Sequence, residues 1–219
     1  MKNAAIIVAA GSSKRFGHKI PKQFLKLNGK IMFLWSVDIF ASIKSFEQII
    51  VVVPSNMLEL LNLKYRSSFM CVAGGKERFD SVKNGLVLVK DNMDFIAVHD
   101  AARPLISRRD VLSVLKEAVK TKAAIAVEKV NDTIKLVSNS GKVLKTLNRA
   151  FLRNVQTPQI FESKLLQRAY SKKVSVNVTD DSQLVENLGL KVSIVETEFL
   201  NFKITTKHDF NLAAKLLKA

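Results

Sequence analysis

The chain has 219 residues, 47% of them hydrophobic and 25% charged, which is long enough for one sizeable core and ordinary for a globular protein. It carries 35 Lys and Arg residues against 19 Asp and Glu residues; the net charge of +16 favours anionic partners, although the scattered basic residues and few aromatic residues argue against nucleic acid. A single cysteine, Cys71, excludes an internal disulfide, and no apolar run approaches membrane-spanning length, so we expect a cytoplasmic protein without a membrane partner.

Apolar runs typical of buried strands alternate with stretches of helical periodicity along the first part of the chain. The predicted strands cover residues 4–10, 48–53, 69–73, 95–98 and 123–127. The predicted helices between them cover residues 31–43, 55–63, 79–89 and 111–119. This order predicts an α/β fold with an open, mostly parallel sheet and helices on both faces. A ligand should then bind beyond the carboxyl ends of the strands, where three polar loops emerge, at residues 11–22, 74–81 and 99–104.

The pattern changes after Asn131. Residues 133–137 and 142–147 flank a polar turn and predict a β-hairpin. Because an isolated hairpin is marginal in water, it should pack on the main sheet or on a second subunit. The rest of the chain predicts, in order, a turn at 156–159, helices at 162–172 and 180–188, a strand at 191–195 and a helix at 209–218. Thr179 is the expected N-cap of the helix at 180–188. We therefore expect a single domain, residues 1–219, with residues 131–149 as a protruding arm.

The loop after the first strand has the composition of a phosphate-binding loop. It begins at Gly11 and carries Arg15 and Lys22, and backbone N–H groups freed by glycine can point at an anion that these cations neutralise. Its spacing fits neither a Walker A loop nor the dinucleotide fingerprint, since Ser13 stands where the second glycine of that fingerprint should be. From this loop alone, an ordinary strand-to-loop turn with solvated lysines is an equally good interpretation.

The segment HDAARP, residues 99–104, ends the fourth predicted strand. Asp100 could hold a divalent cation, which prefers oxygen ligands, and Arg103 could bind a phosphate through two donors. A strand-end aspartate that caps the next helix is the competing interpretation. A catalytic role for His99 is disfavoured, because no Ser or Cys nucleophile is obviously placed to use it.

Taken together, the motifs resemble one family along essentially the whole chain: the 2-C-methyl-D-erythritol 4-phosphate cytidylyltransferases, nucleotidyltransferases of isoprenoid precursor synthesis. The matching segments are AAGSSKRFG with PKQF, GGKERFDSV, HDAARP, Asp132-Thr133, Asn148-Arg149, QTPQ, TDDSQLVE and NFKIT. The resemblance implies a Rossmann-like nucleotidyltransferase fold. It also implies an enzyme that transfers CMP from CTP to 2-C-methyl-D-erythritol 4-phosphate by direct in-line attack and releases pyrophosphate, with Mg²⁺ or another divalent cation as cofactor.

The resemblance assigns roles on the nucleotide side of the site. Arg15 and Lys22 look like the cations that hold the phosphates of CTP and stabilise the transition state. The residues that match the positions recognising cytosine and ribose are Ala9, Ala10, Gly11, Gly75 and Ser81. Asp100 matches the acid that coordinates the metal. Ser13 departs from the commoner glycine, so the loop must adopt a conformation that serine tolerates.

Other residues match positions on the acceptor side. Those near the sugar phosphate and the transferred phosphate are Arg103, Thr157 and the catalytic Lys203. Thr179 and Asp180 match a further substrate-binding position. Thr133 and Arg149 match arm residues that reach into the active site of a partner subunit, which implies a homodimer with shared active sites.

Two alternatives remain open from the sequence. A nearby family, ribitol-5-phosphate cytidylyltransferase, shares the first loop, QTPQ and the final KIT, although Ala102 and the DDSQLVE segment look closer to the methylerythritol enzymes. Both acceptors are small polyol phosphates, so the residues do not settle which is used. The other alternative is a non-catalytic basic module that binds nucleotide or RNA, with strongly salt-dependent binding and no release of pyrophosphate.

Overall fold

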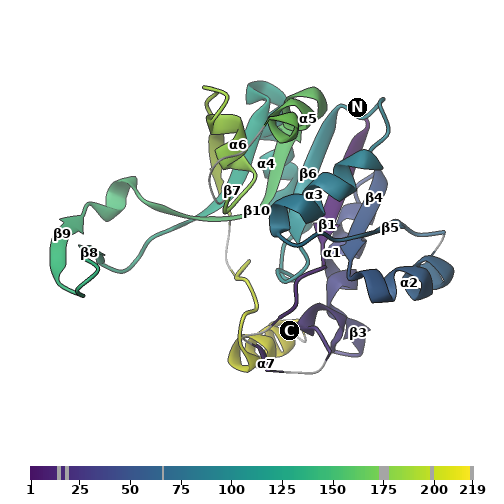
Figure 1. Cartoon of the computed structure of the whole chain (residues 1–219), viewed down its shortest axis with the longest axis horizontal. Helices are drawn as coiled ribbons and strands as arrows, with labels where there is room; N and C mark the ends of the chain where they lie inside the picture. Colours follow the sequence, from purple (N-terminus) through teal and green to yellow (C-terminus); the bar gives the residue numbers. More distant parts are fainter. Residues whose placement is uncertain (14–15, 18–19, 66, 173–177, 198–199, 218–219) are drawn as a thin grey trace.

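The computed structural model describes residues 1–13, 16–17, 20–65, 67–172, 178–197 and 200–217, and its centre is a seven-stranded sheet (Figure 1). The strands lie in the order β11-β7-β10-β6-β1-β4-β5. Their bounds are β1 Asn3–Val8, β4 Phe46–Val53, β5 Met70–Ala73, β6 Phe95–Asp100, β7 Ala123–Lys129, β10 Arg153–Glu162 and β11 Ser193–Glu196. Only β10 runs antiparallel to its neighbours, so the predicted mostly parallel α/β sheet is confirmed.

Helices cover both faces of this sheet because the central strands are apolar on both sides. Alternate residues of β1 show the division: Ala5 and Ile7 pack on one face, and Ala4 and Ile6 on the other. The first face is covered by α1 Met32–Ala41, α2 Leu58–Tyr65 and α4 Arg108–Thr121. The second face is covered by α3 Arg78–Val87, α5 Ser163–Ser171 and α6 Ser182–Glu186. Among the described residues, none of the helices combines the length and the apolar character needed to cross a bilayer.

A third apolar cluster lies beside the sheet and joins three separate segments. It packs Phe16 of the first loop and Ala102 of the loop after β6 against Ile204, near the end of the chain. The closing helix, α7 Lys207–Leu216, covers this cluster, and the ring of its Phe210 meets Phe16 edge-on with 5.9 Å between centroids. A short hairpin, β2 Lys26–Leu27 and β3 Lys30–Ile31, turns at Asn28-Gly29 and also contacts this helix. The first loop, the loop after β6 and the C-terminal segment are therefore held together by apolar packing.

The predicted hairpin is confirmed as β8 Ile134–Val137 paired antiparallel with β9 Val143–Leu147. These strands form a sheet of their own, and Figure 1 shows them projecting as an arm from the body of the molecule. Several large apolar side chains of the arm are exposed, at Leu136, Val137, Val143 and Leu144, and Phe151 beside it is 85% exposed. Within the described residues, the hairpin strands pair with each other and not with the main sheet.

Two sequence predictions are wrong in the region after the hairpin. Residues 156–159 do not form a turn but lie inside β10. Pro158 has no N–H to give to a ladder, and the pairing of β10 with β7 accordingly shifts register between Val155 and Gln159. The sixth helix begins at Ser182 with Asp181 as N-cap, so Thr179 does not cap it; the Asp180 carboxylate accepts from the backbone N–H of Gln183 instead.

Candidate active site

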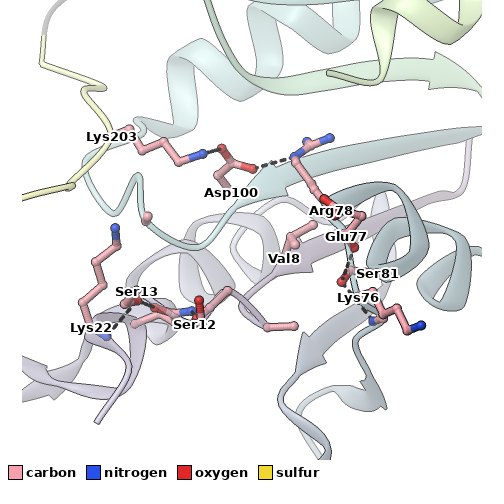
Figure 2. A pocket seen from close by; sticks show the side chains of 15 residues that line it. Val8, Ser12, Ser13, Lys22, Lys76, Glu77, Arg78, Ser81, Asp100 and Lys203 are labelled. Atoms are coloured by element: carbon pink, nitrogen blue, oxygen red, sulfur yellow. Dashed lines mark hydrogen bonds and ion pairs between the residues drawn. The ribbon is translucent and has the colours of Figure 1, made fainter. Parts of the chain in front are cut away.

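A pocket of about 530 Å³ opens at the carboxyl ends of the central strands, where the three polar loops meet (Figure 2). The sequence-predicted residues that line it are Ala10, Gly11, Lys22, Gly75, Ser81, Asp100 and Lys203. Ala9 is fully buried behind them and does not line the pocket. Arg15 lies outside the described residues. The prediction that the ligand site lies beyond the strand ends thus agrees with the position of this pocket.

The first loop is tied at its base by the buried side chain of Gln23. Its Nε2 donates to the carbonyl of Ala9 at 2.8 Å and to that of Gly11 at 2.6 Å. Its Oε1 accepts from the Ser13 hydroxyl at 2.8 Å, and that hydroxyl also accepts from the Lys22 N–H at 3.2 Å. Ser13 has φ +54, in the left-handed region, so the loop does take a conformation that favours glycine. The two hydrogen bonds of its hydroxyl help to stabilise serine there.

The second loop depends on two glycines that allow backbone to approach closely. A Cβ on Gly74 would lie 2.3 Å from the Cβ of Ala10, and one on Gly75 would lie 2.2 Å from the Cβ of Asp80. The Gly75 N–H donates to the Ser81 hydroxyl at 3.1 Å, which fixes the loop to the start of α3. This wall of the pocket is therefore formed by backbone packed directly against Ala10, just after β1, and against α3.

Asp100, at the end of β6, lies between two cations that approach it from opposite sides (Figure 2). Lys203 Nζ donates to Oδ2 at 2.7 Å, and Arg78 Nε donates to Oδ1 at 3.2 Å. Burial alone would raise the pKa of Asp100, but the attraction of Arg78 and Lys203 lowers it far below its ordinary value. Asp100 is therefore a carboxylate that stays ionised while facing the pocket.

The neighbouring His99 is a structural residue. Its ring is fully buried, Nδ1 lies 3.1 Å from the Thr157 hydroxyl, and Nε2 lies 3.2 Å from the Arg103 carbonyl. Burial lowers its pKa to about 4, so the ring is neutral at pH 7. The same Thr157 hydroxyl accepts from the Asp100 N–H at 3.0 Å. His99 and Thr157 together fix the end of β6, and the expectation that His99 is not catalytic agrees with this burial.

A second pocket, of about 250 Å³, adjoins the first. The sequence-predicted residues that line it are Asp100, Arg103, Thr157, Thr179, Asp180 and Lys203. Three residues line both pockets: Arg78, Asp100 and Lys203. Most of the residues that the resemblance assigned to nucleotide and acceptor therefore line two adjoining spaces, with a carboxylate and two cations at the junction.

Arg103 lines the second pocket with a guanidinium that is only partly hydrogen-bonded. Its Nη1 donates to the carbonyl of Asn201 at 2.7 Å, which holds the side chain in place. Its Nε is buried and has no hydrogen-bond partner among the residues that the structure describes. The side chain lines the pocket and brings a positive charge to it, which suits an anionic ligand.

The two arm residues lie elsewhere. Neither Thr133 nor Arg149 lines either pocket, and the Arg149 guanidinium donates to the carbonyl of Asn131 within the arm. Within one chain, the structure does not bring these two residues to the site.

The sequence analysis missed three side chains that organise the site: Gln23, Arg78 and Asp181. Each lies inside a motif that had been recognised, in PKQF, GGKERFDSV and TDDSQLVE respectively. The signal that could have identified them is a charged or amide side chain within a motif that already carried the family resemblance.

The described side chains at the pockets do not form a metal site by themselves. Among the described residues, no three His, Cys, Asp or Glu side chains cluster as a metal site would need. Mg²⁺ in nucleotide enzymes is commonly bound by one or two carboxylates together with substrate phosphates and water. Asp100 fits that donor set because it is ionised and lines both pockets.

Comparisons with known proteins agree on one family. A family model described as 2-C-methyl-D-erythritol 4-phosphate cytidylyltransferase matches residues 3–219. The chain is 69% identical to a protein of that name from Endomicrobium trichonymphae, over 100% of both chains, and 38% identical to one from Caldicellulosiruptor saccharolyticus, over 100% of this chain and 98% of that one.

Solved structures give the same result. The fold matches a 4-diphosphocytidyl-2C-methyl-D-erythritol synthase from Anaerococcus prevotii with a TM-score of 0.87 and 31% identity, covering 100% of this chain and 99% of that one. It matches a 2-C-methyl-D-erythritol 4-phosphate cytidylyltransferase from Thermus thermophilus with a TM-score of 0.81 and 30% identity, covering 100% of both chains.

Proposed function

The chain belongs to the 2-C-methyl-D-erythritol 4-phosphate cytidylyltransferase family, and from this premise we propose how its two adjoining pockets perform the reaction. It is an enzyme of isoprenoid precursor biosynthesis that transfers CMP from CTP to 2-C-methyl-D-erythritol 4-phosphate and releases pyrophosphate. Family membership favours this activity over both alternatives from the sequence, the ribitol-phosphate enzyme and the non-catalytic binding module. The roles of individual residues, the metal and the dimer are the proposal.

One observation carries the assignment of the pockets: they share Arg78, Asp100 and Lys203. In the proposal CTP occupies the larger pocket, with its base and ribose toward Gly75 and Ser81. The acceptor occupies the smaller pocket, where the guanidinium of Arg103 binds its phosphate. The phosphate of the acceptor and the α-phosphate of CTP then meet at the shared residues.

The chemistry needs positioning and neutralisation of charge, and no covalent intermediate on the enzyme. An acceptor phosphate oxygen attacks the α-phosphorus in line, and the bond to pyrophosphate breaks. Lys22 and Lys203 lie at the pocket wall, where negative charge spreads over the phosphate oxygens in the transition state, and Arg15 is proposed to join them. Arg103 orients the attacking phosphate, and Thr157 keeps the Asp100 end of β6 in place.

Asp100 is proposed to hold Mg²⁺ or another divalent cation together with substrate phosphates. When bound, the ion would neutralise charge on the phosphate oxygens. A readout independent of turnover is the binding of CTP measured by calorimetry with and without Mg²⁺. In this proposal Mg²⁺ tightens CTP binding to the wild-type protein and does so much less for Asp100→Asn. The cytoplasmic location expected from the sequence stays a prediction.

The arm is proposed to complete the site of a second subunit. Its exposed apolar residues, Leu136, Val137, Val143 and Leu144, are an unpaired apolar surface on a hairpin that is marginal by itself. A second copy of the chain would cover that surface and receive Thr133 and Arg149 at its acceptor pocket. A guanidinium fork suits a phosphate better than an ammonium does.

Complementation between two inactive variants tests the shared site. Arg149→Ala and Lys22→Ala are prepared separately, mixed and allowed to exchange subunits. If sites are shared, each heterodimer has one site with both lesions and one with neither, so it regains about half the activity of a wild-type dimer. If exchange is proven by mass spectrometry and no activity returns, Arg149 serves its own subunit and the proposal for the arm is wrong.

A further inference from the structure

Arg78 connects two carboxylates that are far apart in the sequence. Its Nη1 and Nη2 donate to the two oxygens of Asp181 at 2.9 and 2.7 Å, and its Nε donates to Asp100 at 3.2 Å. Burial would lower the pKa of Arg78, but Asp181 and Asp100 raise it well above its ordinary value. The guanidinium is therefore held in one orientation: it makes a bidentate ion pair with Asp181 on one side and contacts Asp100, where the two pockets meet, on the other.

Asp181 lies in a site built by three other elements. Its side chain is fully buried, and its Oδ1 also accepts from the hydroxyl of Tyr170, on α5. Its backbone N–H donates to Gln159 Oε1, on β10, at 3.0 Å. Burial raises the pKa of the Tyr170 hydroxyl and Asp181 raises it further, so Tyr170 keeps the proton that it donates. Asp181 thus has fixed partners on α3, α5 and β10.

Stability alone is a weak reason for such an arrangement. The desolvation cost of a buried ion pair commonly cancels its attraction, and apolar residues of similar volume often stabilise a core as well or better. Asp181 lines neither pocket, whereas Arg78 lines both. This arrangement fixes the orientation of the Arg78 Nε–H, which donates to the Asp100 carboxylate.

We propose that Asp181, fixed by Tyr170, is a positioning residue for the cytidylyl transfer: it holds Arg78 so that Arg78 orients the Asp100 carboxylate. With Oδ1 held by Arg78, Oδ2 faces Lys203 and the substrates. The effect on the reaction passes from Tyr170 through Asp181 and Arg78 to Asp100. This inference rests on the proposed function, because it needs Asp100 to act at the junction of the two pockets.

The test removes one hydroxyl at the far end of this chain of contacts. Tyr170→Phe keeps the ring, which stacks on Phe79 of α3 with 4.9 Å between centroids, and deletes only the hydrogen bond to Asp181. The chain has just one other tyrosine, Tyr65, whose ring packs against Phe33 and Phe69, so Tyr65→Phe is the matched control. Tyr170→Phe should lower kcat about tenfold and leave the KM for CTP within about twofold, whereas Tyr65→Phe should change neither.

A double-mutant cycle separates positioning from general destabilisation. Rates are taken per folded protein, at a temperature below the melting transition of every variant. In an Arg78→Lys background, which cannot form the bidentate pair, adding Tyr170→Phe should lower kcat less than about twofold further. An equal tenfold loss in both backgrounds, or a wild-type kcat for Tyr170→Phe, would overturn the inference.

The Asp100→Asn variant distinguishes failure of the positioning role of Asp181 from failure of the proposed function. If Asp100→Asn retains the wild-type kcat, the role proposed for Asp100 is wrong and the inference falls with it. If Asp100→Asn loses turnover while Tyr170→Phe keeps it, the proposed function stands and only the positioning role of Asp181 is wrong.

Discussion

Gln23 gives the most direct test of how the nucleotide loop is held. Gln23→Glu keeps the size and shape of the side chain but replaces the Nε2 donor, which binds the carbonyls of Ala9 and Gly11 at 2.8 and 2.6 Å. The Ala9 carbonyl is buried and the Gly11 carbonyl is partly exposed, so losing their shared donor should cost about 2 and about 1 kcal/mol respectively. For a chain of this size, ~3 kcal/mol lowers Tm by about 6–12 °C.

The same change should weaken CTP binding, because the loop that lines the proposed nucleotide pocket is tied at its base by this side chain. We expect the KM for CTP to rise about tenfold, equivalent to ~1.4 kcal/mol, with a smaller change in the KM for the acceptor. Thermal unfolding followed by circular dichroism gives the stability, and a continuous pyrophosphate assay gives both KM values.

Gln48 provides the matched control. It is also a buried glutamine that ties backbone, since its Nε2 donates to the Leu88 carbonyl at 2.7 Å and its Oε1 accepts from the Lys90 N–H at 3.0 Å, but it lines neither pocket. Gln48→Glu should lower Tm and leave the KM for CTP unchanged. A Gln23→Glu variant with a lowered Tm and a wild-type KM for CTP would refute the role of Gln23 in holding the loop for the nucleotide.

Three further predictions concern charge. Asp100→Asn should lower kcat at least a hundredfold while the protein stays folded; near-normal turnover at saturating Mg²⁺ would remove Asp100 from the metal role. Lys22→Ala should lower kcat about a hundredfold, or ~3 kcal/mol, because its charge matters most in the transition state; a higher KM for CTP with kcat intact would make it a ground-state contact. Burial would raise the pKa of Asp209, but hydrogen bonds from Thr205 and Thr206 lower it to about 2. Because this pKa is below that of Asp209 in the unfolded chain, the ionised carboxylate stabilises the fold above about pH 4, and this stabilisation is lost as the pH falls toward 2. The free energy of unfolding in urea should therefore depend less on pH over that range for Asp209→Asn than for the wild type. An unchanged pH dependence would contradict the assignment.

The main sheet was predictable because its signals are local. Runs such as QIIVVV, ended by Pro54, and helices with regular apolar spacing fix the order of elements, and the order fixes the edge at which loops meet. The two errors arose where local signals conflict with tertiary pairing. Pro158 is typical of a turn, but it lies within β10, where the pairing with β7 shifts register between Val155 and Gln159. Asp180 took the capping role expected of Thr179.

The site was predictable only in part. Loop composition pointed to Gly11, Lys22 and Asp100 without the family resemblance, because glycine, cations and a strand-end acid are local features. The contact of Arg78 with Asp181 joins residues 103 positions apart, so no local pattern could reveal it. The roles of Thr133 and Arg149 came from the resemblance alone, and a single chain places them away from both pockets.

The central claim is tested most directly by following the α-phosphate of CTP. The enzyme is incubated with Mg²⁺ and CTP labelled at the α-phosphate, with 2-C-methyl-D-erythritol 4-phosphate or ribitol 5-phosphate as acceptor, and the products are separated and identified by mass. The account predicts that the label enters 4-diphosphocytidyl-2-C-methyl-D-erythritol with one pyrophosphate released per label transferred, and that ribitol 5-phosphate gives little product. Transfer to ribitol 5-phosphate alone, or label recovered only as free CMP, would contradict it.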